Sequence, residues 1–315
     1  MNRLVRYLLG AVMVVSGAQG ALAMDAQGVN KLGGDTWLNR TYQSVSGGAL
    51  QLNEAIGTKP VYLKFWASWC KPCRAQMPHF VENHKKYADK VTFIAVNIDV
   101  NDEIADVKAT MAEFGMQMPI IVDERGDLAH RYKIMGTPTS ILLDAQGQIV
   151  HKGHKASKKL DERLAKLASF ETMPVVKSQR RITPQRGLVI GDKGFTSVFF
   201  TATWCDWYLA ETRPKVSENC IKGQRFFNRI SKQYPKLHPV GVLSPLWTEL
   251  KDLKDYQKKY RIVYRQLIDI NSAAALKYQV KDNPTLLVFK DGIEVLRVSD
   301  FSDEMHIGSQ LKALF

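Results

Sequence analysis

The chain contains a Cys-x-x-Cys motif, Cys70-Lys-Pro-Cys73. Of all its motifs, this one indicates a chemical reaction most directly. A β-rich alternating run, 61–67, precedes the two cysteines and a helical pattern, 73–88, follows. We therefore expect Cys70 at the N-terminus of a helix, where unpaired N–H groups and the helix dipole favour the thiolate. Cys73, three residues on, lies on the same face and can attack a mixed disulfide formed at Cys70. The pattern indicates thiol–disulfide exchange, with Cys70 as nucleophile and Cys73 as resolving residue.

A Cys-x-x-Cys pair can also be half of a zinc site, which then needs further cysteine or histidine ligands. The first half of the sequence holds no second pair. Among the histidines of this half, His79, His130, His151 and His154 do not fall at ligand spacing with one another. We expect neither a metal nor a cofactor.

The second half repeats the motif in altered form. Trp204-Cys205 echoes Trp69-Cys70 after 135 residues, but Tyr208 takes the place of the resolving cysteine. Cys205 can pair with Cys220, as a structural bridge or an unusual redox pair, or it can be a lone thiol that traps partners. The second half can instead be a non-catalytic binding module. A copper site with a histidine such as His238 is a further option, although the Cys-x3-Cys spacing of copper-chaperone relatives is absent.

Of these options, we predict a Cys205–Cys220 disulfide. One continuous helix between the two cysteines, rising about 1.5 Å per residue, would hold them out of bonding range. Pro214 argues against that helix, because proline is disfavoured in a helix interior and disfavours helix at the preceding residue. The segment 215–219 is then free to fold back toward Cys205. A loop of this size would stabilise the fold by about 3 kcal/mol in the chain-entropy model.

Strands and helices alternate in both halves, which favours an α/β layer fold in each. In the first half we expect strands at 49–52, 61–67, 91–97, 120–122, 140–143 and 148–152, and helices at 73–88, 102–114, 126–132 and 157–167. In the second we expect strands at 196–202, 240–243, 266–270, 286–289 and 294–298, and helices at 223–234, 249–260, 273–278 and from near 303.

A second landmark supports the internal repeat. Thr137-Pro138-Thr139 corresponds to Asn283-Pro284-Thr285 with a shift of 146 residues. The cysteine motifs are shifted by 135, so 146 − 135 = 11 residues are inserted between the two landmarks. We predict two tandem folds of one kind, each a central mixed sheet flanked by helices.

The stretch Lys64-Phe-Trp-Ala-Ser-Trp-Cys-Lys-Pro-Cys-Arg-Ala-Gln-Met-Pro78, together with Gly136-Thr-Pro-Thr139, resembles the thioredoxin superfamily. The similarity is to the TlpA/ResA-like periplasmic thiol-disulfide oxidoreductases and covers about residues 35–170. It implies a thioredoxin-like fold, Trp69 as part of the active-site motif, and a cis-proline at Pro138 that faces the dithiol and orients a substrate strand. The second half resembles the superfamily more weakly, with Pro284 as the equivalent cis-proline.

Lys64 departs from the thioredoxin pattern, which has a buried acid at this position. Tyr62, Lys64 and Trp66 share one face of their strand, which should look toward Cys73. An ammonium there could stabilise a thiolate. Alternatively, its stem packs while the ammonium reaches water. We favour this second interpretation and keep tuning of the dithiol as the alternative.

The first residues predict export. Arg3 and Arg6 precede a short apolar run, 7–15, and Ala21-Leu22-Ala23 is typical of a signal-peptidase site. We predict a signal peptide at 1–23, a TlpA/ResA-like domain at 24–170, a linker at 171–186 and a second thioredoxin-like domain at 187–315. The formal charge falls from +13 to +11 once the two arginines are removed. An exported protein has little opportunity to meet nucleic acid, so we expect no such partner.

Together these features predict a periplasmic thiol-disulfide oxidoreductase that acts on protein thiols and disulfides. The resemblance favours a reductase, recharged by a membrane electron donor of the DsbD or CcdA type. The alternative is a redox-assisted chaperone or client-binding protein, or a metal-delivery factor, whose second domain holds partners.

Overall fold

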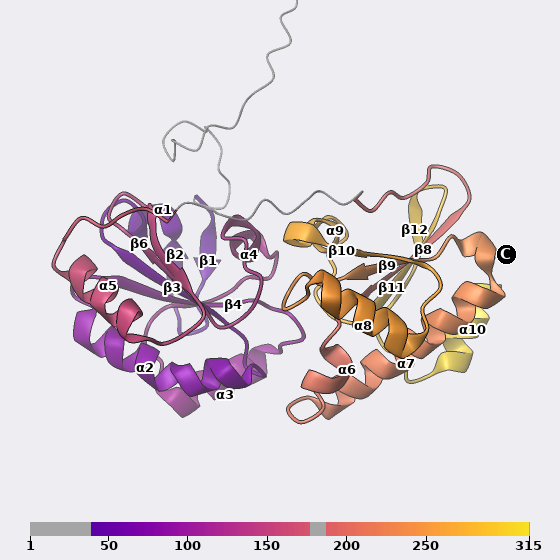
Figure 1. Ribbon diagram of the computed structural model, residues 1–315, viewed down its shortest axis with the longest axis horizontal. Helices are drawn as coiled ribbons and strands as arrows, with labels where there is room; N and C mark the ends of the chain where they lie inside the picture. The colour runs from indigo at the N-terminus through magenta and orange to yellow at the C-terminus, as the bar shows by residue number, and fades with distance from the viewer. Residues whose placement is uncertain (1–38, 177–186, 315) are drawn as a thin grey trace, which may run out of the picture. The chain divides into compact units, whose positions relative to one another are not determined.

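The computed structural model describes residues 39–176 and 187–314 of the chain (Figure 1). The predicted signal peptide, and residues 177–186 of the predicted linker, lie outside the described residues. All described residues belong to one compact unit. Among them, no helix is both long enough and apolar enough to cross a membrane.

The first half contains a five-stranded mixed sheet with the order β5-β4-β3-β6-β7. Its strands are β3 (Val61–Trp66), β4 (Thr92–Asn97), β5 (Ile120–Val122), β6 (Thr139–Leu143) and β7 (Ile149–Gly153). The pairs β3–β4 and β4–β5 are parallel, and β6 runs antiparallel to both β3 and β7. Every residue of β3 is buried, as expected for a central strand covered on both faces.

The second half repeats this topology in a sheet with the order β10-β9-β8-β11-β12. Its strands are β8 (Phe195–Thr201), β9 (Val240–Leu243), β10 (Arg265–Ile268), β11 (Thr285–Lys290) and β12 (Ile293–Val298). The pairs β8–β9 and β9–β10 are parallel, and β11 is antiparallel to β8 and β12. The predicted fold class, mixed α/β sheets flanked by helices, is confirmed, and two sheets of one topology fit tandem folds.

Helices pack beside each sheet (Figure 1). In the first half they are α1 (Leu52–Ala55), α2 (Lys71–Tyr87), α3 (Ile104–Phe114), α4 (Asp127–Arg131) and α5 (Lys158–Ala168). In the second they are α6 (Cys205–Tyr208), α7 (Pro214–Gln233), α8 (Leu250–Tyr260), α9 (Ala273–Lys277) and α10 (Glu304–Lys312), with short 3-10 turns at Pro235–Leu237 and Ile270–Ser272. The apolar stripe of α5 enters the core, which explains its strongly amphipathic sequence.

Most predicted elements lie within two residues of the observed ones. The short helices α1 and α6 and the two 3-10 turns were not predicted, and two further differences concern a strand and a long helix. A strand β1 (Thr41–Gln43) pairs with β2 (Ala49–Gln51) and was not predicted. The helix predicted at 223–234 begins nine residues earlier, at Pro214. The break before Pro214 is therefore where the sequence placed it, and the chain folds back as expected, since the Cα atoms of Cys205 and Cys220 lie 6.1 Å apart. Residues 215–219 make this return as the first part of α7. Proline at the first helical position costs no hydrogen bond, so it starts the helix.

Strand register locates the 11-residue insertion. Trp66 pairs with Asn97 across β3 and β4, and Thr201 pairs with Leu243 across β8 and β9. The shift is 201 − 66 = 135 on the first strand of each pair and 243 − 97 = 146 on the second. Because Cys205 keeps the shift of 135, the extra residues lie between Cys205 and Leu243. This interval holds α6, α7 and the chain between them.

Candidate active site

The Cys-x-x-Cys turn forms the start of α2. Cys70 is the N-cap residue, and its Sγ accepts a hydrogen bond from the Cys73 backbone N–H at 3.2 Å. Pro72 stands in the first turn, where its missing N–H costs nothing. Cys70 and Cys73 are joined by a disulfide, with their Cα atoms 5.2 Å apart. The structure therefore holds the oxidised form of the pair.

A cis peptide bond lies beside this turn. The Thr137–Pro138 bond is cis, and Thr137 lines the same cavity as Pro72. The Thr137 side chain is buried, and its Oγ1 has no hydrogen-bond partner among the described residues. His154 Nδ1 lies 3.0 Å from the Pro138 carbonyl oxygen. The arrangement leaves a hydroxyl next to the dithiol that is able to pair with a bound group.

A buried carboxylate holds the loop that leads into Cys70. Asp102 Oδ2 accepts hydrogen bonds from the Ser68 backbone N–H and from Asn97 Nδ2, each at 2.7 Å, and its Oδ1 accepts the Ser68 hydroxyl. Burial raises the pKa of Asp102, opposed by these hydrogen bonds and by Arg213. The carboxylate fixes the turn from β3 into α2, so it positions the cysteines without contacting them.

Lys64 does not behave as the sequence suggested. It is only 1% exposed, and its Nζ donates to Gln76 Oε1 at 2.7 Å and to Ser140 Oγ at 3.2 Å. The expectation that the ammonium reaches water is wrong, because side chains of α2 and β6 close over it. Burial lowers the pKa of Lys64 to about 7. Tuning of the dithiol by its charge stays a prediction, and it applies near and below pH 7, where the amine is protonated.

The tryptophans that precede the two motif cysteines stack on each other. The ring centroids of Trp69 and Trp204 are 5.2 Å apart, with an interplanar angle of 28°. Trp69 Nε1 donates to the Val100 carbonyl and Trp204 Nε1 to the Leu246 carbonyl, each at 2.8 Å. Val100 and Leu246 differ by 146 residues, the shift between β4 and β9. Equivalent groups of the two halves thus make equivalent hydrogen bonds on either side of the stack.

The loops that follow β4 and β9 make a second reciprocal contact. Asn101 and Trp247 correspond, since 101 + 146 = 247. Asn101 Nδ2 donates to the Asn283 carbonyl at 2.9 Å, and the Asn283 N–H donates back to Asn101 Oδ1 at 3.2 Å. The Trp247 N–H donates to the Met135 carbonyl at 2.8 Å. Each loop therefore binds the segment just before the cis-proline of the other half.

Gly136 makes room for Trp247. A Cβ atom at Gly136 would lie 2.5 Å from Trp247 Nε1, well inside van der Waals contact. A side chain at this position would push the indole away. The glycine two residues before the cis-proline is therefore required by a ring from the second half of the chain.

Charged pairs join the halves around the same contact. Arg213 bonds Ser68 Oγ at 2.8 Å, and it lies 2.9 Å from Asp106 and 3.6 Å from Asp102. Lys281 pairs with Asp99 at 2.7 Å, and Lys71 pairs with Glu211. Arg213 and Glu211 lie in the inserted region between Cys205 and Leu243. The insertion thus supplies two of the charges that hold the halves together.

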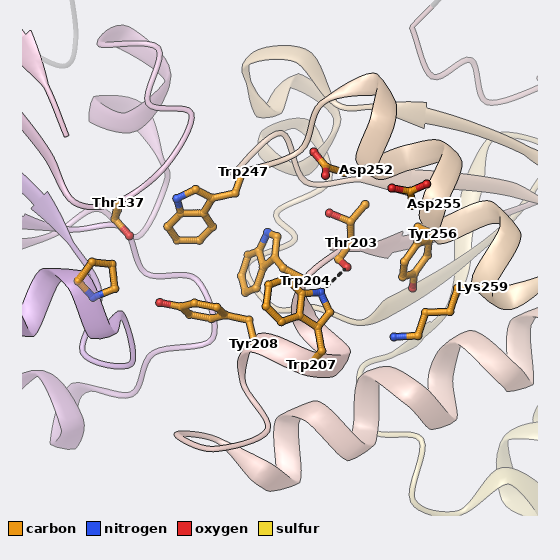
Figure 2. A pocket seen from close by; sticks show the side chains of 11 residues that line it. Thr137, Thr203, Trp204, Trp207, Tyr208, Trp247, Asp252, Asp255, Tyr256 and Lys259 are labelled. Carbon is orange, nitrogen blue, oxygen red and sulfur yellow. Dashed lines mark hydrogen bonds between the residues drawn. The ribbon is translucent and has the colours of Figure 1, made fainter. Parts of the chain in front are cut away.

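Trp204, Tyr208 and Trp247 form what we call the aromatic cover (Figure 2). All three rings contact Trp69, with centroid distances of 5.2, 6.2 and 5.8 Å respectively. Cys70 and Cys73 are both 0% exposed and share one buried cluster with Trp204 and Leu246. A disulfide of another protein cannot reach a buried sulfur atom, so exchange requires the buried cluster around the cysteines, which includes Trp69 and Trp204, to open.

The second half has its own cysteine pair beside its own cis-proline. Cys205 and Cys220 are joined in a disulfide, with Cα atoms 6.1 Å apart, and both are buried. Their Sγ atoms lie 3.7 and 3.5 Å from the carbonyl oxygen of Asn283, and the Asn283–Pro284 bond is cis. Across residues 39–176 and 187–314, no three His, Cys, Asp or Glu side chains cluster as metal ligands would.

Sequence reasoning missed Asn101, Arg213, Gly136 and Trp247. One signal was available for the loops: applying the 146-residue shift to the end of β4 pairs Asn101 with Trp247. Nothing in the sequence signals that each would contact the opposite half.

Removing one ring of the aromatic cover should expose the dithiol. Each aromatic contact contributes about 0.5–1.5 kcal/mol, so we expect Trp247→Ala to speed reduction of Cys70–Cys73 by dithiothreitol about tenfold. Gly136→Ala, which displaces the same ring, should act in the same direction. Timed alkylation followed by peptide mass analysis gives the rate at these two cysteines. Met305→Ala, at a site that is 85% exposed on α10, is the control. Equal rates in all four proteins would show that the ring does not limit access.

Lys64 should make stability depend on pH. Its pKa falls from 10.5 to about 7 on folding, so the unfolded state binds more protons between these values and stability rises with pH across that window. The free energy of unfolding of wild type minus that of Lys64→Met should increase by up to about 1.4 kcal/mol per pH unit between pH 7.5 and 9.5. Urea titrations of both oxidised proteins measure it. A difference that stays constant with pH would contradict the buried amine.

The second cysteine pair should be inaccessible to alkylation. In a Cys70→Ser/Cys73→Ser variant, denatured without reductant, we expect no added alkyl group by intact mass, and two after reduction. Two groups added before reduction would mean that Cys205 and Cys220 are free thiols. Replacing both by alanine should then cost about 3 kcal/mol in unfolding free energy, from the loss of a 15-residue cross-link.

Comparison with known proteins agrees with the first half of the chain. A model of the AhpC/TSA family matches residues 34–152. The thioredoxin-like protein YneN of Bacillus subtilis is 37% identical over 125 residues, which are 39% of this chain and 72% of YneN. The thiol-disulfide oxidoreductase ResA of Bacillus cereus is 34% identical over 132 residues, 41% of this chain and 75% of ResA. The crystal structure of StoA from Bacillus subtilis, 26% identical, covers 39% of this chain and 93% of StoA with a TM-score of 0.35.

The family model and the two relatives confirm the resemblance drawn from the Lys64–Pro78 stretch. Both relatives are more than 30% identical to this chain over more than two thirds of their own length. The chain therefore belongs to the AhpC/TSA family of thioredoxin-like proteins and is a thiol-disulfide oxidoreductase.

Proposed function

We propose that this enzyme is an exported reductase of protein disulfides that works through Cys70 and Cys73. The observation that carries the proposal is the position of the Cys-x-x-Cys turn, at the start of α2 and beside the cis peptide bond at Pro138. A helix N-terminus favours the Cys70 thiolate, and a nearby cis-proline segment offers backbone and hydroxyl groups to a client strand.

The proposed reaction has two exchange steps. In the reduced enzyme, the Cys70 thiolate attacks one sulfur of a client disulfide; a mixed disulfide forms and the other client sulfur leaves as a thiolate. The Cys73 thiolate then attacks Cys70 Sγ and releases the second client thiolate. Two electrons pass to the client, and the enzyme is left with the Cys70–Cys73 disulfide seen here. A dithiol donor reverses the change by the same two steps.

We further propose the periplasm as the location, with cleavage after Ala23 and domains at 24–170 and 187–315 joined by 171–186. The resemblance supports a membrane donor of the DsbD or CcdA type, with electrons flowing outward to clients. A protein that only holds clients, without disulfide exchange, is less well supported. The relatives include thiol-disulfide oxidoreductases, and a binding module would not need a dithiol.

The second half then serves the first. Its aromatic cover packs on Trp69, the residue before Cys70, and its Glu211 pairs with Lys71, the residue after Cys70. On this basis it governs which partners gain access. Tyr208 at the resolving position removes the usual second step from Cys205. A division of labour follows, in which one copy carries the chemistry and the other controls access.

Two cysteine variants test the mechanism. Cys70→Ser should abolish reduction of insulin disulfides in a coupled thiol assay, because the proposed mechanism assigns the attack on the client disulfide to Cys70. Cys73→Ser should instead accumulate a mixed disulfide with the client, visible as a band shift on non-reducing gels. If Cys70→Ser keeps its exchange rate, the assigned nucleophile is wrong.

The reduction potential tests the direction. Equilibration of Cys70–Cys73 with glutathione buffers should give a value well below the roughly −120 mV of a strong oxidant such as DsbA. A potential near that value would assign the enzyme as an oxidase.

A further inference from the structure

A cavity of about 520 Å³ lies beside the dithiol turn (Figure 2). Pro72, between the two cysteines, and Thr137, before the cis-proline, line it from the first half. The second half contributes the rest of the wall, mainly aromatic side chains. Its volume falls within the range of about 300–1,000 Å³ that is typical of ligand pockets. Because Pro72 lines it, whatever occupies it lies against the turn that carries the two cysteines.

The wall is a set of four rings: Trp204, Trp207, Tyr208 and Trp247. Tyr208 stacks on Trp247 with centroids 6.1 Å apart, and Trp207 meets Tyr208 edge-on at 5.8 Å. Trp207 is 61% exposed, although its Nε1 donates to the Thr203 carbonyl at 3.1 Å, which fixes the ring's orientation. An indole held in one orientation but left largely open to water gives an apolar ligand a wall to cover.

Figure 2 shows polar groups at opposite ends of this cavity, with Thr137 at one end and Asp252 and Asp255 at the other. Thr137 Oγ1 is buried without a hydrogen-bond partner among the described residues. A buried hydroxyl without a partner is costly, and a ligand N–H would satisfy it once the neighbouring side chains move aside. This end of the cavity therefore favours a hydrogen-bond donor.

The opposite end is acidic. Lys259 also lines the cavity, but its ammonium lies 2.7 Å from the buried Asp206 carboxylate, which offsets its charge. Asp255 pairs with Lys251 one helical turn away at 2.5 Å, and both side chains are exposed. Exposed pairs of this kind are weak, so a cation on a ligand can compete for Asp255. This end of the cavity therefore favours a basic group on the ligand, although the overall charge of the chain is +13.

We propose that this cavity binds an extended segment of the client polypeptide in which an apolar side chain is followed by a basic one. The apolar side chain covers Trp207 and its neighbouring rings, the basic side chain reaches Asp252 and Asp255, and a backbone N–H pairs with Thr137 Oγ1. The proposal rests on the proposed function for the identity of the client. Since the cavity is open while Cys70 is buried, docking here precedes movement of the aromatic cover.

Cysteine-free peptides test the site apart from any exchange chemistry. Isothermal titration of the intact oxidised protein with acetyl-Gly-Leu-Phe-Gly-Lys-Lys-amide should show binding. Replacing Leu-Phe by Ser-Ser, or Lys-Lys by Glu-Glu, should weaken it. Trp207→Ala should weaken binding of the first peptide about tenfold, as loss of one aromatic wall predicts. Asp255→Asn should weaken it about threefold, within the range for a partly exposed charge pair.

Two matched controls should leave binding unchanged. Val263→Ala removes an apolar side chain that is 73% exposed outside the cavity. Glu162→Gln removes an acid that, like Asp255, pairs with a lysine one helical turn away, but on α5. Circular dichroism of each variant shows whether the fold is kept, and Asp255→Asn alone suffices if Trp207→Ala does not fold.

Several results would overturn the proposal. One is equal binding of the Leu-Phe and Ser-Ser peptides, and another is that Trp207→Ala and Asp255→Asn both bind as their controls do. A third is that benzyltrimethylammonium binds as tightly as the peptide, which would assign the cavity to a small cation. Insulin reduction measured in parallel separates the two levels. If the protein reduces insulin but does not bind the peptide, only the proposed site is refuted. If it binds the peptide but does not reduce insulin, the proposed function is refuted and the site stands.

Discussion

The stacked rings of Trp69 and Trp204 are the contact on which the arrangement of the active site depends. Each indole is tied by its Nε1 to the loop after the next parallel strand of its own half, so stacking them brings those loops face to face. Asn101 and Trp247 then reach the opposite cis-proline segments. Single aromatic contacts contribute only about 0.5–1.5 kcal/mol, which is compatible with a contact that can open.

Electrostatics reinforce the same contact without making it permanent. Arg213 and Lys281 pair across the halves with carboxylates on the loop after β4 and in the first turn of α3. Asp102 is buried and tied to the Ser68 loop, whereas the other pairs are partly exposed and therefore screened by salt. The amine of Lys64, at the position where the resemblance implies a buried acid, is itself buried, and burial lowers its pKa to about 7. The charge of this side chain consequently changes near neutral pH.

The sequence predicted the parts of the site that are local. Cys70, Pro72 and Cys73 could be placed because a strand-to-helix turn is encoded in a short run of consecutive residues. The order of strands and helices along the chain followed from apolar periodicity. The state of Lys64 could not be predicted, because its burial is decided by Gln76 and Ser140 on other elements. The three-residue strand β1 is too short for an alternating pattern. The start of α7 was misplaced because Pro214 was treated only as a breaker, although proline also begins helices.

The role of Trp247 and the cavity that it lines could not be predicted from the sequence, for a different reason. The loop after β9 has no motif of its own, and its role depends on contact with another half of the chain. Internal repeats offer a partial remedy, since the equivalence of Asn101 and Trp247 is readable from two landmark shifts. What the repeat does not encode is that equivalent loops would cross over to each other's cis-proline segment.

Tyr208 has a consequence for reversibility. Its ring lies 6.2 Å from that of Trp69, at the position where a second Cys-x-x-Cys motif would carry its resolving thiol. A cysteine there would place a nucleophile in the contact that encloses the first dithiol. Exchange between the two copies could then lock them together covalently, and the enzyme would be trapped by its own chemistry. A tyrosine keeps the aromatic surface and removes the thiol, so no covalent link between the two copies can form at this position.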